Sequence, residues 1–355
     1  MGSGLHLAVA LEGSGWHPAA PHDGDARFTA GHWVDLVKEA ERGLLDFVTL
    51  EDSLGPEGRL DAVQVAARVA PLTSRIGLVP TAIATHTEPF HLSKSLATLD
   101  YVSEGRAGVR VRVSFRPEDA RHFGRRTFPE GPITASDQLA VDLLEEAGDY
   151  TEVLRRLWDS WEDDAEIRDA ATGRFIDRDK LHYIDFEGRF FSVKGPSITP
   201  RPPQGQPLVT VLGHADPVYD LANRVADVLF FTPRGVDDIR DVAAKAPDVH
   251  RFADLVVFFD ADRKARLDEQ AELTSDAHVF VGSPTDLADL LAEWHEAGVS
   301  GFRLRPGSLP EDLTGVVDGL VPELRRRGLF RTSYEESTLR GLLGLPRPAN
   351  RYATA

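Results

Sequence analysis

The sequence predicts an α/β fold, a parallel (β/α)8 barrel of the TIM type with insertions. Apolar runs of strand length alternate with helical patterns along all 355 residues, and strands that are joined by helices lie parallel. Eight strand–helix units can be counted, and eight is the number that closes such a barrel. An open, doubly wound sheet is the alternative, but no G-x-G-x-x-G motif follows the first strand, which weakens it.

In the first half of the chain, each predicted strand is a short apolar run, as expected where both faces of a parallel sheet are covered. These strands span residues 5–11, 44–50, 76–83 and 107–113. Thr29 is the candidate cap of the first helix, in which Trp33, Leu36, Val37 and Ala40 repeat at helical spacing. The next helices span residues 60–70, 89–102 and 137–161.

The second half continues the alternation. Its strands span residues 208–212, 228–232, 255–259 and 301–304, and its helices span residues 217–225, 236–246, 284–297 and 310–327. Three segments fall outside the repeat: an Arg-rich polar loop at 115–134, an excursion at 162–207 and a Pro-rich tail at 330–355. Loops as long as the first are usually functional or disordered, so we interpret it as a lid. We expect one barrel domain over residues 1–355, with the tail wrapped around its outside.

The composition excludes several classes of protein. No run of 18 apolar residues occurs, and the N-terminus lacks a basic region and a long apolar stretch, so we expect neither a membrane span nor a signal peptide. The chain has no Cys, which excludes thiolate chemistry, and its net charge of −17 argues against nucleic acid as a partner. No His or carboxylate cluster has metal-ligand spacing, and no G-x-S-x-G occurs. A soluble, cytoplasmic protein without a metal site is expected.

Three segments have unusual compositions. Residues 157–165 read L-W-D-S-W-E-D-D-A, residues 186–196 read F-E-G-R-F-F-S-V-K-G-P, and residues 334–348 read Y-E-E-S-T-L-R-G-L-L-G-L-P-R-P. A generic helix end needs neither two tryptophans nor a block of acids, because unpaired carboxylates avoid apolar surroundings. These segments resemble the bacterial luciferase-like flavin-dependent monooxygenases, in the branch of the nitrilotriacetate, alkanesulfonate and long-chain alkane monooxygenases.

Further matches extend the resemblance over nearly the whole chain, including L-D-Y-V-S-E-G-R-A-G at 99–108 and D-A-R-H-F-G at 119–124. The resemblance implies a luciferase-like barrel that uses reduced FMN and O2 to insert one oxygen atom into a small organic substrate. It also implies a separate flavin reductase and a homodimer. One branch of the wider superfamily uses a deazaflavin for hydride transfer, which remains an alternative.

The resemblance also implies roles for individual residues. Trp16 and His17 match an aromatic–Arg–His–Pro turn after the first strand, where they would form a wall for the flavin ring and a polar contact or proton donor. A packed turn is the alternative. Asp52 matches an acid that faces the flavin, and Thr81 lies in the matching third strand. His86 follows that strand, near the ring or facing solvent, whereas Trp158 and Trp161 are expected to be packing residues.

The chain departs from the family at positions that contact flavin. Where the family has W-N-x-V-T-S, residues 109–114 read V-R-V-R-V-S, and an Arg-Tyr pair is replaced by Leu143-Leu144. The family's phosphate-binding Q-A-G-S-S reads V-L-G-H-A at 211–215. Backbone N–H groups at the helix start after Gly213 and His214 could still bind phosphate. A flavin-less partner subunit or binding protein is therefore a further alternative.

Side chains alternate between the two faces of a strand, so Arg110 and Arg112 share one face of the fourth strand and its valines share the other. We expect the valines to face the helices and the two arginines to point into the barrel. Two cations in a confined site are costly unless an anion faces them. We hypothesise that Arg110 or Arg112 replaces a lost neutral contact and draws in an anion, either Glu51, Asp52, a flavin phosphate or an acidic substrate. An internal salt bridge to Asp52 or Glu12 is the alternative.

Overall fold

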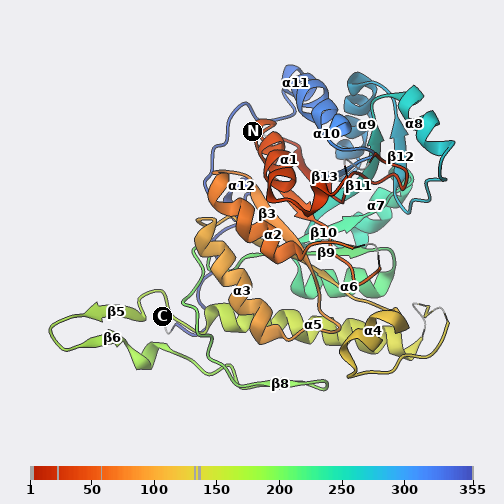
Figure 1. Cartoon of the computed structure of the whole chain (residues 1–355). Helices are drawn as coiled ribbons and strands as arrows, with labels where there is room; N and C mark the ends of the chain where they lie inside the picture. The colour runs from red at the N-terminus through yellow and green to blue at the C-terminus, as the bar shows by residue number, and fades with distance from the viewer. Residues whose placement is uncertain (1–3, 22–23, 57, 132, 135–136, 354–355) are drawn as a thin grey trace.

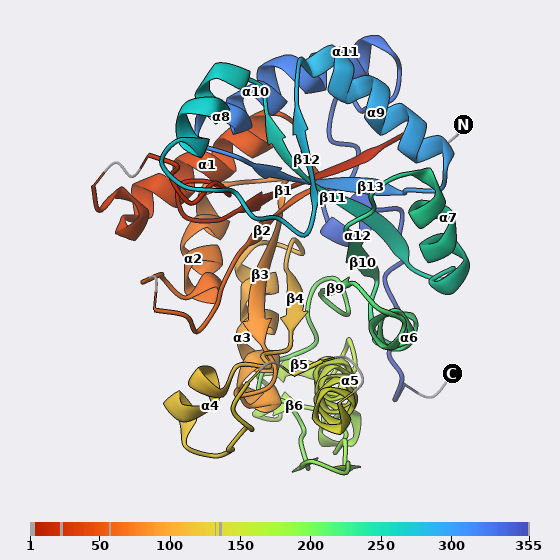
Figure 2. The same ribbon diagram turned by 90° about the vertical axis from the view of Figure 1, so that its right-hand side faces the viewer.

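The computed structural model describes residues 4–21, 24–56, 58–131, 133–134 and 137–353, so residue 132 of the predicted loop and the last two residues of the tail lie outside it. Within these ranges, eight parallel strands close into a barrel, in which β13 returns to pair with β1 (Figures 1 and 2). In ring order they are β1 (His6–Leu11), β2 (Phe47–Leu50), β3 (Gly77–Ile83), β4 (Gly108–Arg112), β9 (Leu208–Gly213), β10 (Val228–Phe231), β11 (His250–Phe258) and β13 (Gly301–Pro306). The predicted barrel is confirmed.

Helices cover the outside of the barrel, as the alternation requires. They are α1 (Ala30–Arg42), α2 (Ala62–Val69), α3 (Pro89–Val102), α5 (Gln138–Asp159), α6 (Asp216–Val225), α7 (Val236–Lys245), α9 (Pro284–Glu296), α10 (Glu311–Gly315) and α11 (Val321–Arg326). A π-helical turn, Val316–Leu320, joins the last two. The side chain of Thr29 accepts a hydrogen bond from the His32 N–H, which confirms it as the cap of α1. Among the described residues, no helix combines the length and the apolar character that a membrane span requires.

Three elements near the carboxyl end of the barrel were missing from the sequence prediction. The predicted polar loop contains α4 (Pro117–Phe123), and α8 (Ala261–Asp268) follows β11. The third is β12 (His278–Val281), which pairs with Leu255–Phe258 of β11, beyond the stretch of β11 that pairs with β10. β12 therefore extends the barrel wall at the carboxyl end of the strands, where barrel enzymes place their active sites.

The barrel interior has an apolar half and a charged half. Towards the amino ends of the strands, a cluster of inward side chains packs together: Ala8, Phe47, Val79, Leu208, Val228, Phe230 and Phe252. Towards the carboxyl ends, the buried inward side chains include Glu51 after β2, Arg110 of β4, Asp254 of β11, and Arg303 and Arg305 of β13. Charged groups in a barrel core are costly unless they are paired, so these side chains must contact one another or a ligand.

The C-terminal tail closes the amino end of the barrel. Its short helix α12 (Leu339–Leu342) inserts Leu339, followed by Leu343, into the apolar interior cluster. Gly77 makes room for the insertion, because a Cβ atom at this position would lie 2.5 Å from Leu339 Cδ1. The sequence predicted a tail on the outside of the barrel; this part of it instead plugs the end of the barrel.

A mostly buried carboxylate, that of Asp227, ties the tail to the rest of the barrel. Asp227 accepts hydrogen bonds from Arg155 Nη2 at 3.0 Å and from Arg340 Nη1 of the tail at 3.1 Å. Burial alone would raise the pKa of Asp227, but the two arginines outweigh it and hold the pKa below the usual value. The unfolded chain then binds this proton more tightly, so the contribution of Asp227 is complete above pH about 4 and is lost as the pH falls towards the folded-state pKa.

We therefore expect the stability difference between the wild type and Asp227→Asn to shrink on acidification. It should be largest near neutral pH and decline below pH about 4. Urea midpoints of both proteins, measured across this range, test the expectation. A difference that stays constant down to pH about 3 would show that Asp227 is not held ionised by the arginines.

The predicted excursion forms two hairpins beside α5. β5 (Glu166–Asp169) pairs with β6 (Arg174–Ile176), and β7 (Phe186–Glu187) pairs with β8 (Ser192–Val193); in Figure 1 the first projects from the side of the molecule. Trp158 Nε1 donates to the Ser93 carbonyl at 3.1 Å, and Trp161 Nε1 donates to the Ser197 carbonyl at 2.7 Å. Both tryptophans are buried, which confirms their role in packing.

Candidate active site

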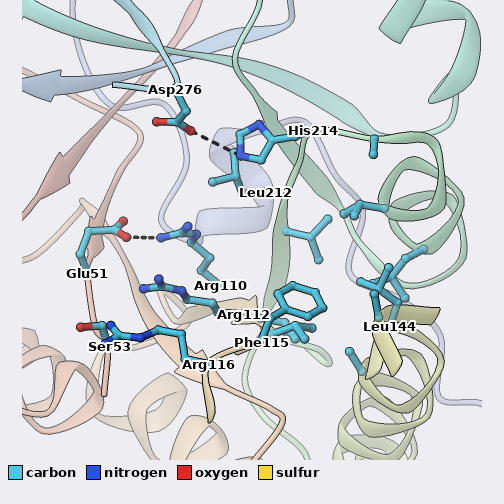
Figure 3. Close-up of a pocket in the computed structure, with 18 of the residues that line it drawn as sticks. Glu51, Ser53, Arg110, Arg112, Phe115, Arg116, Leu144, Leu212, His214 and Asp276 are labelled. Atoms are coloured by element: carbon cyan, nitrogen blue, oxygen red, sulfur yellow. Dashed lines mark hydrogen bonds and ion pairs between the residues drawn. The ribbon is translucent and has the colours of Figure 1, made fainter. Parts of the chain in front are cut away.

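A cavity of about 650 Å³ opens at the carboxyl end of the barrel, and Figure 3 shows most of the residues that line it. The strand ends of β1, β2, β4, β9 and β13 supply its floor, and α5 and α6 supply one wall. A cavity of this size and position is typical of a small-molecule site in a barrel enzyme.

A chain of alternating charges crosses the cavity floor. Arg110 Nη1 donates to Glu51 Oε2, and Arg303 Nη1 donates to Glu51 Oε1 at 3.1 Å. Burial alone would raise the pKa of Glu51, but Arg110, Arg303 and Arg305 outweigh it and lower the pKa. Burial lowers the pKa of Arg110 to about 10 despite the neighbouring Glu51. Both partners are therefore charged at neutral pH.

The series of alternating charges continues to the rim of the cavity. Arg303 Nε donates to Asp254 Oδ1 at 2.8 Å, and Arg305 Nε donates to Asp254 Oδ2 at 3.0 Å. Arg305 Nη1 then donates to Asp276 Oδ1 at 2.7 Å, beside β12. We call these six residues the charge ladder: Arg110, Glu51, Arg303, Asp254, Arg305 and Asp276. It contains three cations and three anions and therefore carries no net charge.

One further arginine is left without a counter-charge. Six arginines line the cavity, and among the described residues only Arg112 has no carboxylate within ion-pair distance. Its Nη1 donates to the backbone carbonyl of Asp52 at 2.7 Å, and its side chain is exposed to the cavity. In a molecule with a net charge of −17, the cavity thus presents an uncompensated cation to its contents.

Part of the cavity lining is apolar. It includes Leu144 of α5, Val218 and Leu221 of α6, and Phe115 after β4, and Figure 3 shows Leu144 on the other side of the cavity from the Arg112 guanidinium. The site therefore combines an apolar surface with a cation. A bulky organic molecule with a planar apolar part and an anionic group fits this combination.

Trp16 and His17, which follow β1, lie in different environments. Trp16 lines the cavity, and the Arg305 guanidinium lies 4.8 Å from its ring centroid, within the range of a cation–π contact. His17 is buried outside this cavity: its Nε2 is 3.1 Å from Asp268 Oδ1 of α8, and its Nδ1 accepts from the Ala19 N–H at 3.1 Å. The acceptor role of Nδ1 puts the proton on Nε2, which donates to Asp268. The structure therefore brings only Trp16 to the cavity.

Asp52 and Thr81 lie in a neighbouring cavity of about 490 Å³. Thr49 and Glu51 point into the barrel, so alternation turns Asp52 to the other side, where its carboxylate accepts from the N–H groups of Ser53 and Ala62. Thr81 lies opposite Arg110 in the β3–β4 register. The inward acid at the end of β2 is Glu51 rather than the predicted Asp52.

Arg110 and Arg112 both point into the barrel mouth, and of the predicted carboxylates only Glu51 forms an ion pair with either of them in the described structure. Arg110 pairs with Glu51, a candidate anion, and forms no ion pair with Asp52 or Glu12 in the described structure. Glu12 instead pairs with Arg59 at 2.8 Å. Arg112 contacts Asp52 through its backbone carbonyl rather than its carboxylate. Of the two arginines, only Arg112 is available to an incoming anion.

The helix start after β9 is less suited to an anion than predicted. Gly213 is the last residue of β9, and α6 begins with Asp216 and Pro217. Pro217 has no N–H to offer, and Asp216 places a negative charge in the first turn. His214 lines the cavity, but its Nδ1 is 3.0 Å from Thr232 Oγ1 and its Nε2 is 3.4 Å from Asp276.

The sequence prediction missed four members of the charge ladder. Arg303 and Arg305 alternate within β13 as Arg110 and Arg112 do within β4, so the same argument could have placed them inward. Asp254 is a charged residue within the apolar run of β11. A charge in such a run indicates a position of interest, but the prediction did not use it. Asp276 gave no signal, because it precedes the unpredicted β12.

Comparison with known proteins identifies the family. Residues 11–274 match the family described as luciferase-like monooxygenase. The chain is 30% identical to N-acetyl-S-(2-succino)cysteine monooxygenase of Bacillus subtilis (strain 168), with 98% of each chain covered. It is also 30% identical to nitrilotriacetate monooxygenase component A of Aminobacter aminovorans, over 99% of this chain and 96% of the relative.

The fold agrees with this relationship. EDTA monooxygenase from Chelativorans sp. BNC1 superposes with a TM-score of 0.82 at 23% identity, over 97% of this chain and 99% of that one. Such a likeness over the whole chain includes the excursion and the tail as well as the barrel. The chain therefore belongs to the luciferase-like monooxygenase family.

Proposed function

We propose that this protein is a flavin-dependent monooxygenase that uses reduced FMN and O2 to insert one oxygen atom into a small organic substrate. The observation that carries the proposal is the main cavity, in which an apolar wall faces the uncompensated Arg112 at the mouth of a monooxygenase-family barrel. The name of the Aminobacter relative, component A, supports a second component, and we propose that a separate reductase supplies the reduced flavin.

The residues present fit FMN. Its planar ring would lie against Leu144, Val218 and Leu221, and its phosphate would face Arg112. Arg110 Nε is buried without a hydrogen-bond partner in the described structure, so it is a free donor beside the cavity. Buried donors rarely lack an acceptor, and a ring carbonyl of the flavin would supply one.

When bound, reduced FMN supplies the electrons that activate O2, and the protein binds, orients and excludes water. The charge ladder holds Arg110 rigid, because each of its cations is fixed by at least one carboxylate. Trp16 and the apolar wall keep water from the ring. The roles predicted for Thr81, Gly213 and His214 stay predictions, as do the homodimer and the cytoplasmic location, whereas His17 and Asp52 lie outside the cavity proposed for the flavin.

A flavin titration tests the proposal. We expect calorimetry to detect binding of oxidised or dithionite-reduced FMN. We also expect the absorbance of the reduced complex, on mixing with air, to pass through a transient species that free flavin does not show. Lack of uptake of either form of FMN would refute the proposal. Preferential binding of a deazaflavin would favour the hydride-transfer alternative.

One observation favours a flavin-less paralogue as the second candidate. The Arg110–Glu51 pair occupies an inward position where the family resemblance implies a neutral Asn that contacts the ring. If the pair excludes the ring, small organic anions should still bind at Arg112. Binding of an anion such as benzoate, without any uptake of FMN, would select this candidate.

A further inference from the structure

The turn that follows β1 is fixed to the end of β13 by its backbone. The Trp16 N–H donates to the Pro306 carbonyl at 2.9 Å, and the His17 N–H donates to the Gly307 carbonyl at 3.0 Å. Gly15 allows this close approach, because its φ is +130° and a Cβ atom there would lie 2.5 Å from the Gly307 carbonyl oxygen. From this fixed backbone, the side chains of Trp16 and His17 contact different parts of the protein.

Trp16 contacts both the charge ladder and an apolar cluster. The Arg305 guanidinium lies over its ring, and the ring lines the main cavity. Trp16 also packs against a cluster that contains Phe258 of β11 and Leu267 of α8. Backbone hydrogen bonds do not set the rotation of a side chain about its own bonds, so this packing decides which face Trp16 presents to the cavity.

His17 holds the same cluster in place. Its side chain is fully buried, and its ring meets that of Phe258 edge to face, with 6.0 Å between the centroids and 82° between the planes. Its Nε2 donates to Asp268, which directly follows Leu267 in α8. Adjacent residues of α8 therefore contact His17 and the cluster that supports Trp16.

The acceptor on α8 is a charged group that is itself held in place. Lys264 Nζ donates to Asp268 Oδ2 at 2.6 Å, and His17 Nε2 is 3.1 Å from Asp268 Oδ1. The hydrogen bonds from Lys264 and from His17 hold the pKa of Asp268 below its usual value. Because a hydrogen bond to an ionised carboxylate is stronger than one between neutral groups, the contact between His17 and Asp268 can anchor the turn to α8.

Neither ring nitrogen of His17 is available to a molecule in the main cavity. Its Nδ1 accepts from the Ala19 N–H and its Nε2 donates to Asp268, while the side chain has no exposed surface. Among the described residues, none from α8 lines the main cavity. An effect of His17 on the site therefore passes through a residue that does line it, and Trp16 is adjacent in the chain and packs on the same cluster.

We propose that His17 is a positioning residue for Trp16. By joining the turn to α8 through Asp268, it fixes the cluster against which Trp16 packs, and so fixes the wall that Trp16 presents to the main cavity. In this role His17 acts on the site without contacting the flavin, unlike the polar contact or proton donor that the family resemblance implies. The consequence for flavin binding rests on the proposed function, whereas the positioning of Trp16 does not.

Fluorine NMR of the protein labelled with 5-fluorotryptophan tests the positioning. The chain has five tryptophans, and the variant Trp16→Phe identifies the resonance of Trp16. We expect His17→Ala and Asp268→Ala each to shift or broaden this resonance. The resonances of Trp158 and Trp161, which pack against α3 and the excursion, should stay unchanged and serve as internal references.

Further variants separate the two contacts of His17. The amide N–H of a glutamine can replace imidazole Nε2, so His17→Gln should keep the bond to Asp268 and retain the wild-type resonance of Trp16. His17→Asn keeps only an acceptor for the Ala19 N–H, as in an Asx-turn, and should shift the resonance as His17→Ala does. The double variant His17→Ala/Asp268→Ala should shift it no further than either single variant. Asp262→Ala is the matched control, because it removes an exposed carboxylate from α8 and leaves the contact with His17.

Flavin affinity gives a second readout. His17→Ala and Asp268→Ala should weaken FMN and riboflavin equally, by about two- to tenfold, the range expected when one aromatic contact is lost. Equal losses are expected because Trp16 faces the ring, which both flavins share. His17→Gln should retain both affinities. A loss confined to FMN would instead indicate a contact with the phosphate and would contradict the role of Trp16.

Several outcomes would overturn the inference. One is a Trp16 resonance that stays unchanged in both His17→Ala and Asp268→Ala. A shift in His17→Ala alone would show that His17 only fills space, and an equal shift in Asp262→Ala would assign the effect to the charge of α8. If His17→Ala does not fold, Asp268→Ala decides, because the Asp268 side chain is 41% exposed and its removal opens no core. Lack of FMN uptake by the wild type refutes only the proposed function, whereas FMN uptake with an unchanged Trp16 resonance refutes only this inference.

Discussion

Asp254→Asn is expected to destabilise the protein by about 3–5 kcal/mol, because it removes the shared partner of two buried cations. The Asp254 side chain is fully buried and accepts hydrogen bonds from Arg303 and Arg305. Burial alone would raise the pKa of Asp254, but the two arginines outweigh it and lower the pKa, so the group is ionised. Urea unfolding at neutral pH, followed by tryptophan fluorescence, measures the loss.

Asp276→Asn is the matched control at the other end of the charge ladder. Asp276 also pairs with Arg305, but its side chain is 45% exposed. Exposed salt bridges contribute about 0–1 kcal/mol, so this variant should lose little stability. Equal losses in the two variants would show that burial does not decide the strength of the ladder.

Arg112→Leu is expected to weaken FMN binding ten- to a hundredfold and to leave riboflavin binding nearly unchanged. The prediction follows from the uncompensated charge of Arg112, since only FMN carries a phosphate. Hydrogen bonds to charged groups contribute about 1.5–3 kcal/mol, which corresponds to this range of affinity. Calorimetric titration of the wild type and the variant with both flavins measures the difference.

Two further variants separate charge from geometry. Arg112→Lys keeps the charge and should retain most of the FMN affinity, although it loses the two-pronged geometry of the guanidinium. Arg116→Leu changes another arginine of the same cavity, one that has Glu118 and Asp119 within 3.9 Å, and should cost only a few-fold. If Arg112→Leu weakened both flavins equally, Arg112 would contact the ring rather than the phosphate.

The barrel could be predicted from the sequence because its strands are local patterns. Each is an apolar run followed by a helix of period 3.6, and the order of the strands follows the order of the chain. The missed elements lack these signals. β12 has four residues, of which none is fully buried, and α8 reads A-D-R-K-A-R-L-D with one buried side chain. Their positions depend on packing against β11 rather than on local preference.

The site was harder to predict because its contacts join distant strands. Alternation correctly turned Arg110 into the barrel, but the choice of Glu51 as its partner depends on the stagger between β2 and β4. Asp52 and Glu51 are adjacent acids, and a shift of one residue exchanges the inward and outward positions. The lining of the main cavity could not be inferred either, since it draws on more than four separate elements.

The plug formed by Leu339 and Leu343 has a consequence for how the protein is made. All eight strands leave the ribosome before this segment does. A nascent chain can therefore close its barrel while the amino end still exposes Phe47 and Phe252 to water. Synthesis must reach residue 343 before that opening is sealed. A stop codon shortly before residue 339 would therefore yield a chain with every strand present but with an exposed apolar opening at the amino end of the barrel. We expect such a chain to be bound by chaperones and degraded by proteases rather than to act as a shorter enzyme.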